Sequence, residues 1–314
     1  MSDETFNIRT DLAVEEQERY ASRNVEVPGV KLTESVVSSY GVKITKVEIM
    51  DDHGAKAMGR PIGNYVTIEA SDMMESKHIS SALARELKAM LKKCSPKKID
   101  QMSVLVVGLG NRDVTPDSLG PSVISGLDVN RHIYMLKGND SSNYGISAVI
   151  PGVMAQSGME SAEMVSGIVK QIQPDAVIAI DALAARNTKR LNTTIQLADT
   201  GIHPGSGVGN HRQGLNKETL GIPVIAIGIP TVIDAATIVS DAMDALIGVL
   251  STSEALESVS ATLKNFSDRE KYQLIKELLE PQIGTMFVTP KDIDEDIEIM
   301  AGIVASGINT VFRK

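Results

Sequence analysis

The stretch 104-VLVVGLGNRDVTPDSLGP-121 decides the fold class, because it joins a buried strand to a glycine-rich turn and then to a helix. A nucleotide-binding turn of the form G-x-G-x-x-G, counted from Gly108, would have its third glycine at position 113, but that residue is Asp113. Asp117 follows four residues later, where a second carboxylate would repel a phosphate. The turn therefore has the surroundings of a phosphate-binding loop and the wrong charge for a phosphate.

Two further apolar runs match the one before this turn. The segments 175-DAVIAI-180 and 222-IPVIAIGI-229 are continuous like 102-MSVLVVG-108, as in strands that are buried on both faces of a parallel sheet. Helical patterns such as residues 158–172 lie between the runs. This alternation predicts an α/β fold with a mainly parallel sheet sandwiched by helices.

The two ends of the chain add other elements. The segments 41-GVKITKVEIM-50 and 63-GNYVTIEA-70 flank a turn at residues 51–54 and predict a hairpin or a sheet edge, so the N-terminal portion is β-rich. A helix is expected over residues 72–94, and the last helix is expected to begin at Thr289 with Pro290 in its first turn, which makes the C-terminal part helical. That last helix should bury Ile293, Ile297, Met300, Val304, Ile308 and Val311. Residues 1 to about 30 show no core pattern, and we expect a peripheral leader there.

Composition narrows the possible functions. The chain has 314 residues, of which 42% are apolar, so it can bury a substantial core. A net charge of −9 argues against direct binding of nucleic acid, which needs a basic stripe. A single cysteine, Cys94, excludes an internal disulfide and favours the cell interior. No apolar run has the length of a membrane span, and the acidic N-terminus is unlike a secretory signal.

Three aspartates follow the three apolar runs. Ligands of open parallel sheets bind beyond the carboxyl ends of the strands, and Asp117, Asp181 and Asp234 are expected there. Two carboxylates that lie close together cannot both ionise easily, so one of them holds a proton near neutral pH. One can then act as a base toward a water molecule and the other as an acid toward a leaving amine, which suits amide hydrolysis without a nucleophilic side chain.

Each of these aspartates also has a simpler interpretation. Asp117 could cap the helix that starts near Ser118, and Asp234 could cap the helix expected over residues 235–246. Asp181 could bind a ribose or cap the turn that follows it. The pattern alone leaves open a two-carboxylate hydrolase and a nucleoside- or phosphate-binding enzyme.

A long glycine-rich segment, 199-DTGIHPGSGVGNHRQGLN-216, carries no core pattern. Loops of this length in compact domains are usually functional or disordered. Its histidines, His203 and His211, are expected to be solvated unless a site recruits them.

Five motifs in a fixed order carry a specific resemblance. Together they resemble the germination proteases of spore-forming bacteria, which are endopeptidases that degrade small acid-soluble spore proteins, over a region from about Arg9 to the C-terminus. The motifs are GLGNRDVTPDSLGP, SAVIPGVMAQSGMES (147–161), IDALAAR (180–186), TGIHPGSGVGNHR (200–212) and IGIPTVIDA (227–235). The turn would then deliver a carboxylate where a nucleotide-binding turn receives a phosphate.

A wider resemblance to the hydrogenase maturation endopeptidases concerns the same acids. Their loop glutamate corresponds to Asp117 and their second acid to Asp181, and in that family the pair helps to bind nickel, with a histidine whose place is roughly that of His211. The resemblance implies a hydrogenase-maturation-protease or phosphorylase-like fold. Germination proteases, as the resemblance implies, work without metal or other cofactor through two aspartates, which here are Asp117 and Asp181.

The resemblance also gives the leader a meaning. Family substrates are cut after an acidic residue and before a large apolar residue followed by Ala, and 9-RTDLAVEEQ-17 offers a cut between Asp11 and Leu12. Residues 1–11 would be a propeptide and residues 12–314 a single α/β peptidase domain. Taken by itself, the same segment predicts a helix start with Thr10 as N-cap.

The expected protein is therefore an endopeptidase made as a self-processing zymogen that acts on small acid-soluble spore proteins at germination. We expect Gly205, Ser206, Gly207 and His211 to line the substrate cleft. The family implies a homotetramer in the cytoplasm of the developing spore and in the spore core, with no direct contact to nucleic acid or membrane. A nickel-binding maturation endopeptidase and a nucleoside- or phosphate-handling α/β enzyme are the alternatives.

Overall fold

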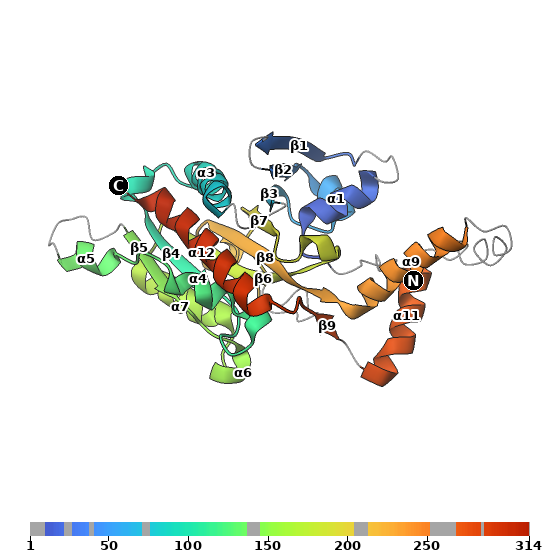
Figure 1. Cartoon of the computed structure of the whole chain (residues 1–314). Coiled ribbons are helices and arrows are strands. Elements are labelled where there is room, and N and C mark those ends of the chain that lie inside the picture. Colours follow the sequence, from blue (N-terminus) through green and yellow to red (C-terminus); the bar gives the residue numbers. More distant parts are fainter. Residues whose placement is uncertain are drawn as a thin grey trace.

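The computed structural model describes residues 10–21, 27–37, 41–70, 76–136, 145–203, 213–251, 268–283 and 286–313. These residues contain a nine-stranded sheet with helices on both faces (Figure 1). The strands are β1 (Val30–Val37), β2 (Val42–Ile49), β3 (Gly63–Ala70), β4 (Ser103–Gly108), β5 (Gly145–Val149), β6 (Ala176–Ala185), β7 (Thr194–Ala198), β8 (Val224–Asp234) and β9 (Phe287–Val288). The helices are α1 (Ala13–Ala21), α2 (Asp52–Met58), α3 (Ser76–Cys94), α4 (Leu119–Ser125), α5 (Arg131–Leu136), α6 (Met154–Ser157), α7 (Ser161–Ile172), α8 (Lys217–Leu220), α9 (Ala235–Leu250), α11 (Asp268–Ile283) and α12 (Ile293–Phe312).

The sheet is mixed, so the expectation of a mainly parallel sheet was wrong. The strand order is β1-β2-β3-β7-β8-β6-β4-β5, and β9 pairs with β8. The three apolar runs form the parallel strands β4, β6 and β8, with β5 beside β4, as predicted for the α/β half. The pairs from β1 to β8, and the pair of β8 with β9, are antiparallel. The short strand β7 causes the difference, because it joins the N-terminal hairpin to the parallel half and merges them into one sheet.

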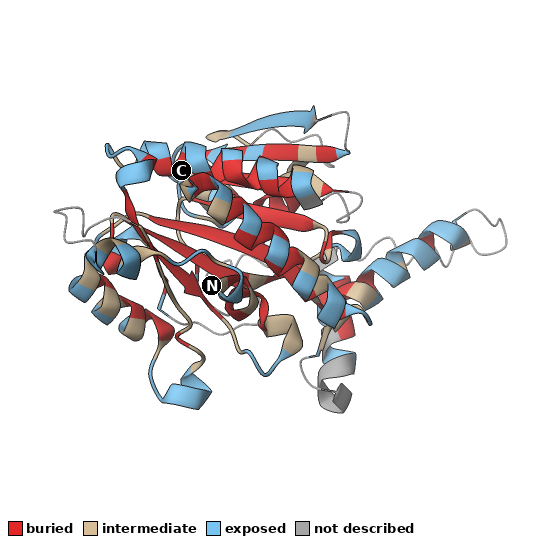
Figure 2. Cartoon of the chain, turned by 60° about the vertical axis from the view of Figure 1, so that its left-hand side comes forward, coloured by how far each residue is buried: buried red, intermediate tan, exposed pale blue. Residues whose placement is uncertain are grey.

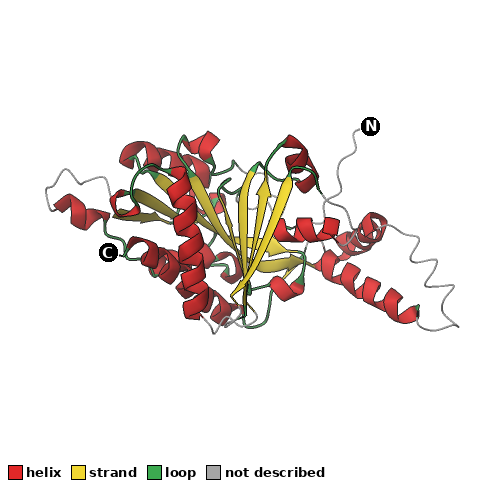
Figure 3. Cartoon of the chain, turned by 90° about the horizontal axis from the view of Figure 1, so that it is seen from above, coloured by secondary structure: helices red, strands yellow, loops and turns green. Residues whose placement is uncertain are grey.

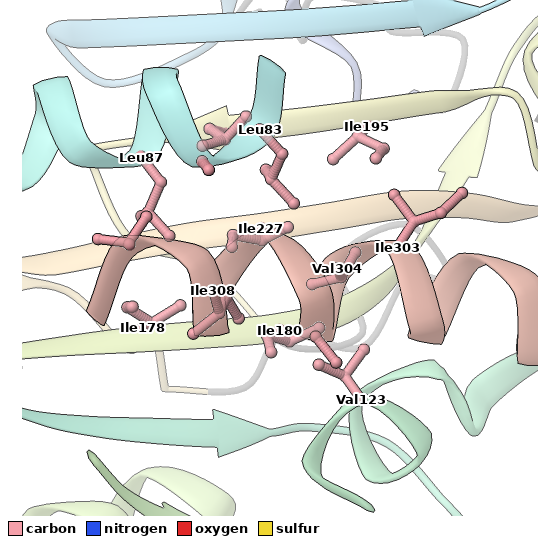
Figure 4. Close-up of a cluster of buried hydrophobic side chains, with 14 of the residues drawn as sticks. Leu83, Leu87, Val123, Ile178, Ile180, Ile195, Ile227, Ile303, Val304 and Ile308 are labelled. Carbon is pink, nitrogen blue, oxygen red and sulfur yellow. The ribbon is translucent and has the colours of Figure 1, made fainter. Parts of the chain in front are cut away.

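One face of the sheet is covered by α3, α4 and α12. Figure 4 shows the apolar side chains of this layer, where Leu83 and Leu87 of α3 meet Val304 and Ile308 of α12 above the strands. The six residues predicted to be buried on the last helix are all buried. That helix begins at Ile293, four residues later than expected, because Thr289 donates instead to the carbonyl oxygen of Thr231 and continues the β9 segment.

The opposite face is covered by α1, α2 and α7. Leu12, Ala13 and Val14 at the start of α1 are fully or almost fully buried in this second core cluster. The expectation of a peripheral leader over residues 1 to about 30 was therefore wrong for its described part. The local pattern did not reveal this, because the segment buries only one short apolar run, between acidic residues.

Two further sequence expectations concern the N-terminal strands. The predicted hairpin is confirmed, since β2 and β3 pair antiparallel from Val42↔Ala70 to Ile49↔Gly63. The predicted turn at residues 51–54 is instead the start of α2, whose N-cap Asp51 accepts a hydrogen bond from the N–H of Gly54. The expected start of the next helix at residue 72 lies outside the described residues, and α3 is described from Ser76.

At the far end of β8 the helices α9 and α11 project from the body as a pair (Figures 1 and 3). Asp234 caps α9 through the N–H of Ala236, as predicted, and also accepts a hydrogen bond from the Tyr272 hydroxyl of α11. Figure 2 shows the strands of the body mostly buried and the outer side of α9 mostly exposed. In the described parts of the chain, no helix combines the length and the apolar character needed to cross a bilayer.

Candidate functional site

Asp117 is held on a turn of 3-10 helix, Thr115–Asp117, beyond the end of β4. The backbone of this turn folds onto Gly110, whose φ of +108° favours glycine and whose Cβ, if present, would lie 2.0 Å from the carbonyl oxygen of Asp117. Asp117 Oδ2 accepts a hydrogen bond of 2.8 Å from the N–H of Asn111. Thr231 of β8 donates to the carbonyl oxygen of Pro116 at 2.7 Å, which fixes the turn to the sheet.

Asp117 is not the cap of the helix that follows it. The N-cap of α4 is Ser118, and the carboxylate of Asp117 turns back to Asn111. The N–H that a phosphate would need in this loop is thus engaged by a carboxylate of the chain itself. This arrangement disfavours the phosphate-binding interpretation of the loop.

Asp181 lies inside β6, so the expectation of a turn after residue 180 was wrong. β6 continues to Ala185 because it stays paired with β8 beyond the end of β4. The Asp181 side chain is only 5% exposed, and its Oδ1 accepts a hydrogen bond of 3.0 Å from the N–H of Ala182. A carboxylate that is fixed within a strand cannot act as the cap of a turn.

Asp117 and the residue before Asp181 are both bonded to one short turn, Gly108–Asn111. The N–H of Leu109 donates to the carbonyl oxygen of Ile180 at 2.8 Å, which sets the turn beside the residue that precedes Asp181. Asp117 is bound to the other end of the turn through Asn111. Residues that are 64 positions apart (117 and 181) in the chain therefore flank one turn at the carboxyl end of β4.

A polar row continues from Asp181 across the sheet. Gly228 pairs with Asp181 on one side and with Gln196 on the other, and Gln196 pairs with Thr67 of β3. Residues that pair directly point to the same face, which here is the face that α1 covers. Gln196 is 7% exposed. Gln196 was not predicted as a site residue, because its only signal in the sequence is a glutamine between Ile195 and Leu197.

The N-terminal segment crosses this polar row. Asp11 donates its N–H to the carbonyl oxygen of Ala184 at 2.9 Å, and its Oδ2 accepts from the N–H of Ala184 at 2.9 Å. Gln196 Nε2 donates to the carbonyl oxygen of Asp11 at 2.8 Å, and Gln196 Oε1 accepts from the N–H of Ala13 at 2.7 Å. The peptide between Asp11 and Leu12 is thus bound over the sheet by backbone and side-chain hydrogen bonds.

A buried ionic cluster holds the rest of the segment. The carboxylate of Glu15 accepts hydrogen bonds from the N–H groups of Arg186 at 2.8 Å and Asn187 at 3.0 Å, and also from the Thr10 hydroxyl. Arg190 lies 3.5 Å from Glu15 and makes shorter ion pairs with Glu18 and Glu69. Burial alone would lower the pKa of Arg190, but the hydrogen bond to Glu18 and the charge of Glu69 outweigh it and raise that pKa above its ordinary value. Arg190 therefore stays charged and ties α1 to β3. The segment does begin a helix, but at Ala13, so Thr10 is not its N-cap as predicted; the Thr10 hydroxyl accepts instead from the N–H of Leu12, before the helix.

The four residues expected to line the cleft lie outside the described residues; they are Gly205, Ser206, Gly207 and His211. The ends of their loop approach each other through the bridge between Ile202 and Leu215, and His203 packs against Gly214. Among the described residues no three His, Cys, Asp or Glu side chains are grouped so that they could hold a metal ion.

The sheet carries two aspartates beside a glycine-containing turn at the carboxyl end of β4, where open α/β sheets bind their ligands. This arrangement is typical of α/β enzymes. The family profile of the germination protease matches residues 8–258 and 250–314. The chain belongs to this family. It is 47% identical to the germination protease of Caldanaerobacter subterraneus subsp. tengcongensis, over 98% of this chain and 95% of that protein. The identity is 44% with the germination protease of Clostridium perfringens strain ATCC 13124, over 98% and 96%, and 39% with that of Priestia megaterium, over 98% and 94%.

Proposed function

We propose that this protein is an endopeptidase of spore germination that activates water with Asp117 and Asp181. Membership of the germination protease family supports the peptidase activity. The observation that carries the choice of residues is that both aspartates lie beside the turn Gly108–Asn111. The N–H of Asn111 donates to the Asp117 carboxylate, and the N–H of Leu109 donates to the carbonyl oxygen of Ile180, the residue before Asp181. One of the two acids acts as the base toward water, and the other protonates the leaving amine.

The two acids have different surroundings, and this supports a division of labour between them. Asp181 is buried within a strand, whereas Asp117 is half-buried on a turn. Burial disfavours the charged form of a carboxyl group, and a neighbouring carboxylate does the same. We therefore propose that one of the two carboxyl groups is protonated and the other ionised, which is the state that acid–base hydrolysis requires.

The protein is further proposed to be a zymogen that removes its own residues 1–11 by a cut between Asp11 and Leu12. Residues 12–314 would then form one peptidase domain, active on small acid-soluble spore proteins as a homotetramer in the spore interior and without a cofactor. The loop with Gly205, Ser206, Gly207 and His211 is proposed to line the cleft. The bonds of Asp11 to Ala184 and to Gln196 are consistent with a propeptide whose last residue occupies the substrate site.

The test is the intact mass of the purified full chain, before and after incubation at mildly acidic pH. The wild-type protein should release a fragment that ends at Asp11, and Asp117→Asn should keep its full mass under the same conditions. Addition of a small acid-soluble spore protein tests cleavage of a second chain. If the wild-type protein neither shortens itself nor cuts that substrate, the proposed function is wrong.

A further inference from the structure

We propose that Gln196 is a catalytic residue that binds the carbonyl oxygen of the scissile peptide and stabilises the negative charge that develops on it. This inference rests on the proposed function, because it takes Asp11–Leu12 as the bond that is cut. Its basis is the pair of hydrogen bonds that the Gln196 amide makes to the residues on both sides of that bond.

The contacts of the Gln196 amide assign its nitrogen and its oxygen. The carbonyl oxygen of Asp11 can only accept, so the atom 2.8 Å from it must be the amide nitrogen. The N–H of Ala13 can only donate, so the atom 2.7 Å from it must be the amide oxygen. An inverted amide would break both bonds, and the donor on the scissile carbonyl is thereby assigned without ambiguity.

The Asp11–Leu12 peptide is bonded to strands β6 and β7, which lie on either side of β8. Asp11 binds Ala184 of β6 through its N–H and Gln196 of β7 through its carbonyl oxygen, and β8 runs between β6 and β7. Gln196 and Asp181 flank Gly228 in one row of this sheet, so their backbones are two strand spacings apart, or about 10 Å. Gln196 binds the carbonyl oxygen of Asp11 from the β7 side of Gly228. Asp181 lies on the β6 side of Gly228, and its side chain points to the same face of the sheet.

Two carboxylates of the N-terminal segment, those of Asp11 and Glu15, also bind backbone N–H groups of the body. The Asp11 carboxylate accepts from the N–H of Ala184, which gives a physical reason for an acidic residue before the cut. The Glu15 carboxylate, four residues further on, accepts from the N–H groups of Arg186 and Asn187. These contacts fix the register of the chain, so that the carbonyl of Asp11 and no other meets Gln196.

The step is balanced as follows. Water adds to the carbonyl carbon of Asp11 and gives one proton to the ionised member of the Asp117–Asp181 pair, while the carbonyl π electrons move to the oxygen that Gln196 Nε2–H binds. That electron pair then re-forms the C=O bond and expels the nitrogen of Leu12, which takes a proton from the second, protonated aspartic acid. The products are the carboxyl group of Asp11 and the free amine of Leu12, and the pair again holds one proton.

The experiment follows self-processing of the full chain by intact mass between about pH 4 and pH 8 in wild type, Gln196→Ala and Gln196→Glu. Because the leader is already bound, the first-order rate reports chemistry and not encounter. Gln196→Ala should process roughly 10²–10³-fold more slowly, as on removal of one oxyanion donor. Gln196→Glu keeps the shape and an acceptor for the Ala13 N–H, but its carboxylate cannot donate near neutral pH.

Acid should rescue the Glu variant alone. A glutamic acid ordinarily titrates near pH 4.3, and burial raises that pKa, so its O–H becomes a donor as the pH falls. The rate of Gln196→Glu relative to wild type should therefore rise with acidification, while that of Gln196→Ala stays flat. Gln101→Glu is the matched control, because the same change is made at an exposed glutamine of the 3-10 turn Ile99–Gln101, which precedes β4 at the end of that strand away from Asp117, and its relative rate should not depend on pH.

The outcomes separate the two proposals. If wild type releases no fragment ending at Asp11, the proposed cut fails and this inference fails with it. If wild type processes and Gln196→Ala stays within about threefold of it, the cut stands and Gln196 has no catalytic part. If both Gln196 variants keep their melting temperature and are slow at every pH, without acid rescue of the Glu variant, the amide only packs or seats the leader and the donor assignment is overturned.

Discussion

Two rows of side chains on opposite faces of the sheet differ completely, although they are formed by consecutive residues. On the face covered by α3 and α12 each chain neighbour of the polar row is an isoleucine, although Ile227 pairs across the strands with Leu197 and not with Ile195; these isoleucines are called the isoleucine row. On the face covered by α1 the members are polar or glycine (Figure 4 shows part of the isoleucine row). The neighbouring pairs are Ile44 and Thr45, Ile68 and Thr67, Ile195 and Gln196, Ile227 and Gly228, and Ile180 and Asp181.

The difference shows how one sheet can separate stability from chemistry. Successive residues of a strand point to opposite faces, so each pair assigns one side chain to the core and the next to the candidate site. The isoleucine row contributes buried apolar area. The polar row is also buried but contributes little apolar area, and it requires desolvation of carboxyl, amide and hydroxyl groups, which costs stability unless each is paired.

The largest expected effect is on chemistry in the polar row. Asp181→Asn replaces a carboxylate by an amide of the same shape and should slow leader cleavage by roughly 10²–10⁴-fold, because an amide cannot accept or supply the proton. The melting temperature should stay at or above that of wild type, since a buried carboxylate is removed. Parallel measurement of intact mass and thermal unfolding checks both. An activity within tenfold of wild type would show that this row does not carry the reaction.

The next effect is on stability in the isoleucine row. Ile68→Ala should lower the free energy of unfolding by about 2–5 kcal/mol, because it leaves a cavity between the sheet and its helices. Denaturant unfolding measures the loss. The cleavage rate of the protein that remains folded should change little, and a large loss of rate at full folding would contradict the division between the two faces.

The smallest expected effect is a gain in the free energy of unfolding at Thr67, next to Ile68. The hydroxyl of Thr67 is buried and has no hydrogen-bond partner among the described residues. Thr67→Val keeps the shape and removes this unsatisfied group, so the free energy of unfolding should rise by about 1 kcal/mol. The same denaturant series that measures Ile68→Ala detects this change. A loss of stability would mean that the hydroxyl is paired and that the polar row is better satisfied than described.

Much of the fold was readable from local pattern. The apolar runs before Asp117 and Asp181 predicted β4 and the start of β6, and the period of the last helix predicted its buried face. The continuous run 222–229 likewise predicted β8. These elements were predictable because their buried residues follow a continuous or a regularly spaced apolar pattern in the sequence.

The antiparallel half and the contacts of the leader were not readable in this way. β7 has five residues between a 3-10 turn and a glycine-rich loop, too few to predict its position between β3 and β8. The bonds of Asp11 and Ala13 to Gln196 join residues more than 180 positions apart in the sequence. No local period records such a contact, and so Gln196 was missed although Asp117 and Asp181 were singled out.

The different supports of the two carboxylates have a consequence for motion. Asp181 belongs to a strand that is bonded to β8 along its length and to β4 up to Ile180, whereas Asp117 ends a single turn of 3-10 helix held to the sheet by Thr231. Segments with few backbone bonds open locally at a lower free energy than central strands. Any fluctuation that changes the separation of the two acids is therefore carried by the turn. We therefore expect the turn Thr115–Asp117, with its bond to β8, to be the mobile partner of the two aspartates and β6 the rigid one.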